Sequence, residues 1–335
     1  MKISRLWRWL VDDERRRFFN RFMDRSIATC EGGRWSHVDG MLCASNWKAW
    51  VLAARPKTLP AAVAPVAMGA GIAWRLTGVL SWWLVWCTLL SAVAIQIATN
   101  FFNDAIDAAK GADTSQRLGP TRATAAGLAS SRAMFLAAGV AILISAAFAL
   151  PLIQARGWMM LVIGLPSLYF SYGYTGGKWP LAYRGWGDVF VLLFFGLIAV
   201  SGTVFVLTGE WRGASLVAGL QVGMLSTVLI AINNLRDLEE DRLSVKRTLA
   251  VRFGKTFSRV EITLLCLLPH VIGFCYWTGL GWGNVAWWPL AAAIPGVLIS
   301  LGIWRTEPSR VYNRFLAIAG LQLIVFAVLW VAAIL

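Results

Sequence analysis

The feature that most limits how this chain can fold is a series of nine apolar stretches, each about as long as a helix that crosses a bilayer. A transmembrane helix needs roughly 20 mostly apolar residues, and it tolerates the Pro and Gly found in several of these stretches. Of the 335 residues, 58% are hydrophobic and 14% are charged, against about 45–50% and about 25% in soluble domains. We therefore expect an all-α polytopic membrane protein. The nine stretches are 58–74, 81–102, 133–153, 158–174, 188–208, 214–233, 259–281, 285–304 and 314–335.

Basic residues are distributed very unevenly around these stretches. All but three of the 31 lysines and arginines lie before the first stretch or at alternate gaps; the exceptions are Arg75, Arg156 and Arg212. Because basic loops stay in the cytoplasm, we expect a multi-pass protein of the cell inner (plasma) membrane with its N-terminus in the cytoplasm and its C-terminus outside. The net charge of +14 does not predict a nucleic-acid partner, because the basic residues are divided among the gaps instead of forming one stripe. The lipid bilayer or an anionic substrate is the expected partner.

The first 46 residues differ from the rest. The charged run 12–17 interrupts any apolar core that a signal peptide would need, and aromatic residues alternate with arginines as in helices that lie on a membrane surface. We expect residues 1–46 to be a basic N-terminal extension, interfacial or disordered, and residues 47–335 to form one transmembrane domain. Met41 could equally be the start of the protein.

Two segments 133 residues apart resemble each other, Ile97–Asp104 and Ile230–Asp237, and each is the cytoplasmic end of an apolar stretch that continues into an acidic loop. Such an internal repeat predicts a binding site where the two units face each other. Within each loop, carboxylates spaced three or four residues apart share one helical face. The resulting pairs are Asp104 with Asp107 and Asp237 with Asp241.

Paired carboxylates repel each other unless a cation lies between them. Mg²⁺ suits such a pair, because it takes one or two carboxylates and completes its shell with water and substrate phosphates. Basic residues between the acids could contact phosphate oxygens directly. We therefore predict a magnesium-dependent diphosphate site, although such residues could also simply make the loops soluble. The basic candidates are Lys110, Arg122, Arg236, Lys246 and Arg252.

The gap after the fourth stretch contains Tyr174 and Lys178 on either side of Gly176-Gly177. One interpretation is a tight turn with no further role. The other places Lys178 toward phosphate and the ring of Tyr174 toward a developing carbocation.

These motifs resemble those of the UbiA-type intramembrane prenyltransferases. The family's two aspartate motifs match Asn103–Asp107 and Asp237–Asp241, and its third element matches Tyr174-x-x-x-Lys178. Within the superfamily, residues 54–62, 110–120 and 246–254 are most similar to the branch that prenylates 1,4-dihydroxy-2-naphthoate. The likeness covers about residues 47–335. It implies nine helices around a central cavity, catalytic roles for the four aspartates with Tyr174 and Lys178, and substrate contacts from Asn103 and Asn233.

One departure concerns the third acid of the first motif, which is Gly111 here, so that Asp113 becomes the nearest additional metal ligand. The resemblance implies transfer of a polyprenyl group from its diphosphate to 1,4-dihydroxy-2-naphthoate with loss of the carboxylate, giving demethylmenaquinone or a phylloquinone precursor. Arg55 is our candidate for the acceptor's carboxylate, or alternatively a charge that anchors the first stretch. The remaining alternatives are a sister enzyme acting on 4-hydroxybenzoate, homogentisate, haem or chlorophyllide, and a transporter.

Overall fold

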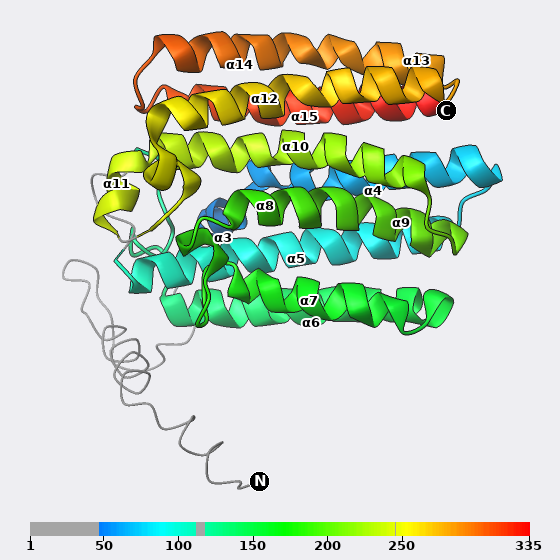
Figure 1. Ribbon diagram of the computed structural model, residues 1–335. Helices are drawn as coiled ribbons and strands as arrows, with labels where there is room; N and C mark the ends of the chain where they lie inside the picture. The colour runs from blue at the N-terminus through cyan, green and yellow to red at the C-terminus, as the bar shows by residue number, and fades with distance from the viewer. Residues whose placement is uncertain (1–46, 112–117, 245) are drawn as a thin grey trace, which may run out of the picture.

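A computed structural model describes residues 47–111, 118–244 and 246–335, and every regular element in these ranges is helical. The expected N-terminal extension, Met41 and Asp113 lie outside the described residues. Most long helices pack side by side with the next one along the chain (Figure 1). In chain order the elements are α3 (Trp47–Ala54), η2 (Pro56–Thr58), α4 (Pro60–Thr77), α5 (Trp82–Ala109), α6 (Ser131–Arg156), α7 (Met159–Gly173), η3 (Leu181–Tyr183), α8 (Gly187–Val191), the π-helical η4 (Leu192–Ile198), α9 (Ala199–Thr208), α10 (Gly213–Arg236), α11 (Leu238–Leu243), α12 (Leu249–Gly279), α13 (Gly283–Trp287), η5 (Trp288–Ala292), α14 (Ala293–Arg305) and α15 (Tyr312–Ile334).

The helices account for each of the nine expected stretches, but not all of them are full-length spans. Among the described residues, seven helices are long and apolar enough to cross a membrane. An eighth results if α3 with η2 and α4 count as one span bent by 48°. The stretch expected at 158–174 is the shorter apolar helix α7, of 15 residues. The protein is thus a multi-pass membrane protein, while nine spans and the orientation of the termini stay predictions.

Helix ends follow from local chemistry. Ser130 and Thr248 are N-caps whose hydroxyl oxygens accept hydrogen bonds from the backbone N–H of Ala133 and Val251, which satisfies donors that a helix start leaves unpaired. At the opposite end of the bundle, α4 stops at Gly78, whose φ of 71° is left-handed. Glycine adopts this conformation without a steric penalty and so ends the helix there.

Helix α10 is the centre of the bundle. In the most apolar 18-residue stretch of each helix, 78% of the residues of α10 are buried, against 22% of those of α6. Helix α10 packs against α4, α12, α15 and the π-helical η4. The contact with η4 has little room for side chains: a Cβ atom built on Gly196 would lie 2.4 Å from the Gly219 carbonyl oxygen and 2.6 Å from Gly223 Cα. Three glycines therefore let two backbones touch, as small residues do between membrane helices.

Candidate active site

A cavity of about 650 Å³ lies among α4, α5, α7, α8, η4, α9 and α10. All four expected aspartates line it, at the ends of α5 and α10 and on α11. Leu152, Met160 and Val206 also line it, near the ends of their helices that lie away from these aspartates. Thr88 and Asp107 both line it and lie 19 residues apart on α5, which corresponds to about 28 Å of helix. The cavity therefore suits a molecule with a long apolar tail and a polar head that a cation bound to the aspartates could hold.

The Asp104 carboxylate supports the loop that follows α5. The residue is 1% exposed, and its two oxygens accept hydrogen bonds from the backbone N–H of Ala123 (3.1 Å) and Thr124 (2.8 Å). Because both donors belong to the backbone, Asp104 fixes the course of the segment that carries Arg122.

Asp107 lies one helical turn further along α5 and has a different environment. Its Oδ1 accepts a hydrogen bond of 2.8 Å from the Tyr183 hydroxyl. Its Oδ2 lies 3.6 Å from both the Arg122 Nη2 atom and the Lys246 Nζ atom. Residues from three separate segments thus converge on one buried carboxylate.

Lys246 joins the two halves of the internal repeat. Its Nζ atom is 3.6 Å from Asp107 Oδ2 and 3.9 Å from Asp241 Oδ1. The acidic ends of the two repeats therefore face each other, as their sequence similarity suggested. An ammonium group between carboxylates of both motifs marks the place where a cation is favoured.

Asp237 is held by its own neighbour. Arg236 donates two hydrogen bonds of 2.7 Å to the two oxygens of Asp237 and a third of 2.7 Å to Asn313 Oδ1. Arg236 is 2% exposed, so this bidentate pair is buried in the cavity wall. Its guanidinium thus positions Asp237.

The two expected asparagines also line the cavity. Asn103 Oδ1 accepts a hydrogen bond from the Thr175 hydroxyl, and Asn233 Nδ2 donates to the Leu229 carbonyl of its own helix at 2.9 Å. Asn103 therefore connects α5 to the turn after α7.

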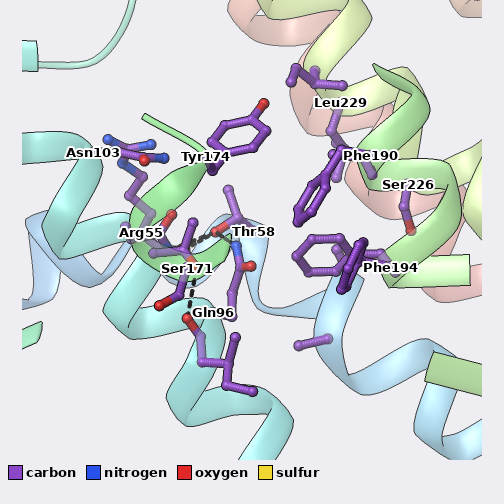
Figure 2. A pocket seen from close by; sticks show the side chains of 18 of the residues that line it. Arg55, Thr58, Gln96, Asn103, Ser171, Tyr174, Phe190, Phe194, Ser226 and Leu229 are labelled. Atoms are coloured by element: carbon purple, nitrogen blue, oxygen red, sulfur yellow. Dashed lines mark hydrogen bonds between the residues drawn. The ribbon is translucent and has the colours of Figure 1, made fainter. Parts of the chain in front are cut away.

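Tyr174 is on the cavity wall, on the side of Arg55 and Asn103, with Phe190 and Phe194 across from it (Figure 2). The ring centroids of Tyr174 and Phe190 are 5.6 Å apart, and those of Phe190 and Phe194 are 4.2 Å apart. Aromatic faces attract cations. The wall can therefore stabilise positive charge next to the acidic end.

Three expected site residues are not among those that line the cavity. Lys178 is exposed, and Arg252 donates to the backbone carbonyls of Arg247 (3.1 Å) and Arg184 (2.6 Å). Lys110 donates to the Thr175 carbonyl at 2.7 Å and lies 3.9 Å from the centroid of the Tyr183 ring. Lys110 and Arg252 thus stabilise the loops around the site.

The Lys110 ammonium is enclosed by these partners although the residue as a whole is exposed. Desolvation of the ammonium lowers the pKa of Lys110 from 10.5 to about 8; Asp107 opposes this shift and Lys246 adds to it. Burial dominates because an ammonium group is far better solvated by water than by a ring and one carbonyl.

Arg55 lines the cavity at the junction between α3 and η2. It has a left-handed backbone, with φ of 51°, which is costly for a residue other than glycine. Hydrogen bonds on either side maintain it: Asn100 Nδ2 donates to the Ala54 carbonyl at 2.8 Å, and the Thr58 N–H and hydroxyl both donate to the Arg55 carbonyl at 2.9 Å. This strained backbone fixes the point from which the Arg55 side chain extends.

The sequence did not single out Tyr183, Asn100 or Asp188. Tyr183 and Asp188 follow closely after the Tyr174–Lys178 segment, and Asn100 is one turn before the first aspartate motif. For Tyr183 and Asp188 that closeness is the only signal in the sequence, whereas Asn100 also lies in the repeated segment 97–104, at the position that matches Asn233. Their partners come from other helices, so only the folded chain shows what they contact.

The donor set is suitable for Mg²⁺. Carboxylates are hard oxygen ligands, and Mg²⁺ commonly takes one or two of them with water and phosphate oxygens. Among the described residues, no three His, Cys, Asp or Glu side chains are grouped as metal ligands. Each acidic pair therefore fits a shell in which substrate and water supply the remaining oxygens.

Comparison with known proteins identifies the family. A relative from Mycobacterium leprae, 1,4-dihydroxy-2-naphthoate octaprenyltransferase, is 36% identical over 71% of this chain and 80% of its own. A UbiA homologue from Aeropyrum pernix in the apo state has a similar fold, with a TM-score of 0.64 at 15% identity over 82% of this chain and 98% of its own. A UbiA homologue from Archaeoglobus fulgidus bound to GPP and Mg²⁺ gives a TM-score of 0.59 at 17% identity over 85% and 99%. The model of the UbiA prenyltransferase family matches residues 62–333, so this chain belongs to that family.

Proposed function

We propose that this protein transfers a polyprenyl group from a polyprenyl diphosphate to 1,4-dihydroxy-2-naphthoate, with loss of the carboxylate, in the biosynthesis of menaquinone. The observation that carries the proposal is the position of Lys246, between Asp107 and Asp241 at the acidic end of a long, mostly apolar cavity. With Mg²⁺ bound to its carboxylates, the acidic end suits the diphosphate, and the apolar part suits the isoprenoid tail. Similarity to relatives named for this reaction supports the choice of acceptor.

Donor binding would use the two acidic pairs. Asp104, Asp107, Asp237 and Asp241 are the proposed ligands of Mg²⁺, which when bound neutralises negative charge on the leaving diphosphate. Arg122 and Lys246, at present close to Asp107, would turn to the phosphate oxygens. Preorganised positive charge of this kind favours the departing group more than the intact substrate.

The allylic carbon becomes positively charged as its bond to the diphosphate breaks. Tyr174 and Phe190, 5.6 Å apart between ring centroids, can stabilise that charge through their ring faces. The mostly apolar lining of the cavity limits the water that could capture the cation. The electron-rich ring of the acceptor then attacks.

Arg55 is the proposed contact for the acceptor's carboxylate. Its backbone is fixed by Asn100 and Thr58, and Figure 2 shows it on the same side of the cavity as Asn103 and Tyr174. An arginine can bind a carboxylate through two parallel hydrogen bonds. The Arg55→Ala variant should therefore raise KM for the acceptor more than for the donor.

Incubation tests the reaction. Membranes containing the protein should convert 1,4-dihydroxy-2-naphthoate and a polyprenyl diphosphate to a prenylated quinol with one CO₂ released per transfer, and excess EDTA should abolish turnover. Asp107→Asn and Asp241→Asn should be inactive, whereas Glu210→Gln, at an exposed acid, should be normal. Preference for 4-hydroxybenzoate, or a product that keeps its carboxylate, would assign the protein to a sister branch.

We also propose that residues 47–335 are the catalytic domain and that the protein lies in the cell inner membrane, with the acidic loops in the cytoplasm. Cysteine labelling tests the orientation. In a background without the five native cysteines, Gly111→Cys should react only from the cytoplasmic side and Trp282→Cys only from the other. Reaction of both from one side would overturn the orientation.

A further inference from the structure

Asp188 is a buried carboxylate that the roles proposed so far do not use. It lies in the first turn of α8, is 4% exposed, and lines the cavity. Its Oδ2 is 3.4 Å from Asn234 Nδ2, a long contact for a hydrogen bond. Its Oδ1 has no hydrogen-bond partner among the described residues.

Such an arrangement is costly unless something else contacts the carboxylate. A buried polar atom left without a partner destabilises the folded protein, and a charged one does so more strongly. No basic side chain in the described part of the chain forms an ion pair with Asp188. Ser226, on α10, is also buried and lines the same cavity, and its Oγ has no partner among the described residues either. Unsatisfied polar groups in this cavity indicate a polar part of a ligand.

The chemistry of a carboxylate limits which part of a ligand this is. Asp188 would repel a diphosphate or another carboxylate, and an isoprenoid tail offers no hydrogen-bond donor. A hydroxyl group on an aromatic ring offers a donor, and Phe190 and Phe194, which lie next to each other in Figure 2, line the same cavity as Asp188. Arg55 lines the same cavity as Asp188. A ring held between these two residues would have its carboxylate at Arg55 and a hydroxyl at Asp188.

We propose that Asp188 accepts the hydrogen bond of an acceptor ring hydroxyl and takes its proton as the ring attacks. This inference rests on the proposed prenyl transfer. As Asp188 takes the proton, the electron pair of the O–H bond becomes part of a ring carbonyl. A π pair of the ring then forms the new bond to the allylic carbon, and the electron pair of the broken allylic C–O bond leaves with the diphosphate. When the alkylated carbon carries the carboxylate, loss of CO₂ returns a bond pair to the ring, and the carbonyl oxygen takes the proton back from Asp188.

The experiment combines one isosteric variant with altered acceptors. Wild type and Asp188→Asn are assayed with 1,4-dihydroxy-2-naphthoate and its two mono-O-methyl ethers, with Glu210→Gln as the matched carboxylate control. Because general base catalysis contributes roughly 10²–10⁴-fold, Asp188→Asn should lose at least about 100-fold in kcat/KM for the diol. With wild type, one of the two ethers should have a kcat/KM as low as the diol has with Asp188→Asn. The KM of Asp188→Asn for the donor should differ from that of wild type by less than about twofold.

The comparison separates a chemical role from a structural one. If Asp188 only supports the fold, Asp188→Asn should discriminate between diol and ether as strongly as wild type does, and the proposal is wrong. A defect confined to the donor would overturn it as well. Should Asp188→Asn fail to accumulate, the smaller Asp188→Ala variant decides: added formate should restore part of the activity, and no restoration would count against the proposal.

Failure of the proposed function would look different. Wild type would then leave 1,4-dihydroxy-2-naphthoate unchanged and prenylate another phenol, such as 4-hydroxybenzoate. In that case the same comparison, made with that phenol and its methyl ether, still tests the role of Asp188.

Discussion

The Tyr183 hydroxyl donates a hydrogen bond of 2.8 Å to Asp107 Oδ1, while the ring of the same tyrosine lies 3.9 Å from Lys110 Nζ and 5.2 Å from Lys246 Nζ. One side chain on the loop after α7 thus orients an acid on α5 and two basic groups around it. The proposed metal ligand Asp107 therefore depends on a residue outside both aspartate motifs.

Tyr183→Phe should weaken the site without dismantling it. The ring, and with it both cation contacts, is kept, while Asp107 loses the donor that orients it. Loss of a residue that orients a metal ligand typically costs about 10–100-fold in metal affinity, so we expect the Mg²⁺ concentration for half-maximal activity to rise by about that factor. Titration of activity with Mg²⁺ measures this, with Tyr169→Phe, at an exposed tyrosine, as the control. An unchanged midpoint would show that Tyr183 does not orient Asp107.

Asp104 and Asp107 should differ in how their loss affects stability. Asp104→Ala leaves the N–H groups of Ala123 and Thr124 without their acceptor, at a cost of about 1–3 kcal/mol for each. Asp107→Asn keeps an oxygen for the Tyr183 hydroxyl. We expect both to lose nearly all activity but only Asp104→Ala to lower the Tm in detergent by several degrees. Equal Tm values would mean that Asp104 does not hold the loop.

The contact between η4 and α10 should tolerate no side chain at Gly196. A Cβ there would meet backbone atoms at 2.4 and 2.6 Å, so the helices must separate, and overpacking of this kind costs about 1–3 kcal/mol. Gly139→Ala is the matched control, because nothing lies within 4 Å of a Cβ on Gly139, and the better helix propensity of alanine should make it neutral or slightly stabilising. Thermal unfolding of both variants measures the difference. Equal stability would show that the two backbones can move apart freely.

The lowered pKa of Lys110 predicts a pH dependence of stability. Native Lys110 loses its charge near pH 8, whereas its ordinary pKa is 10.5, so folding favours the neutral amine. The stability of wild type relative to Lys110→Arg should therefore rise as the pH goes from about 8 to about 10, because arginine stays charged over this range. Unfolding temperatures of both proteins across that interval test it. A constant or falling difference would contradict the shift.

The sequence by itself determined the membrane fold and the acidic pairs. A span is recognised from about 20 apolar residues in a row, and the spacing of Asp104 and Asp107 within one helix is local, so neither needs knowledge of distant parts of the chain. The similarity of 97–104 to 230–237 even indicated that the two acidic ends should face each other, and Lys246 now lies between carboxylates from both. The count of nine spans stays a prediction, because the short length of α7 and the bend between α3 and α4 depend on how these helices pack against their neighbours.

Only the tertiary structure decided which charged residues reach the cavity. Lys178 and Arg252 are basic residues of the kind that binds phosphate, yet they are not among the residues that line the cavity. Asp188 has no motif around it, yet it is buried on the cavity wall with an oxygen that accepts no hydrogen bond from any described residue. The physical reason is that burial and hydrogen bonding are set by side chains from other helices. Asn234 of α10 approaches Asp188 of α8, and no sequence pattern within either helix predicts this contact.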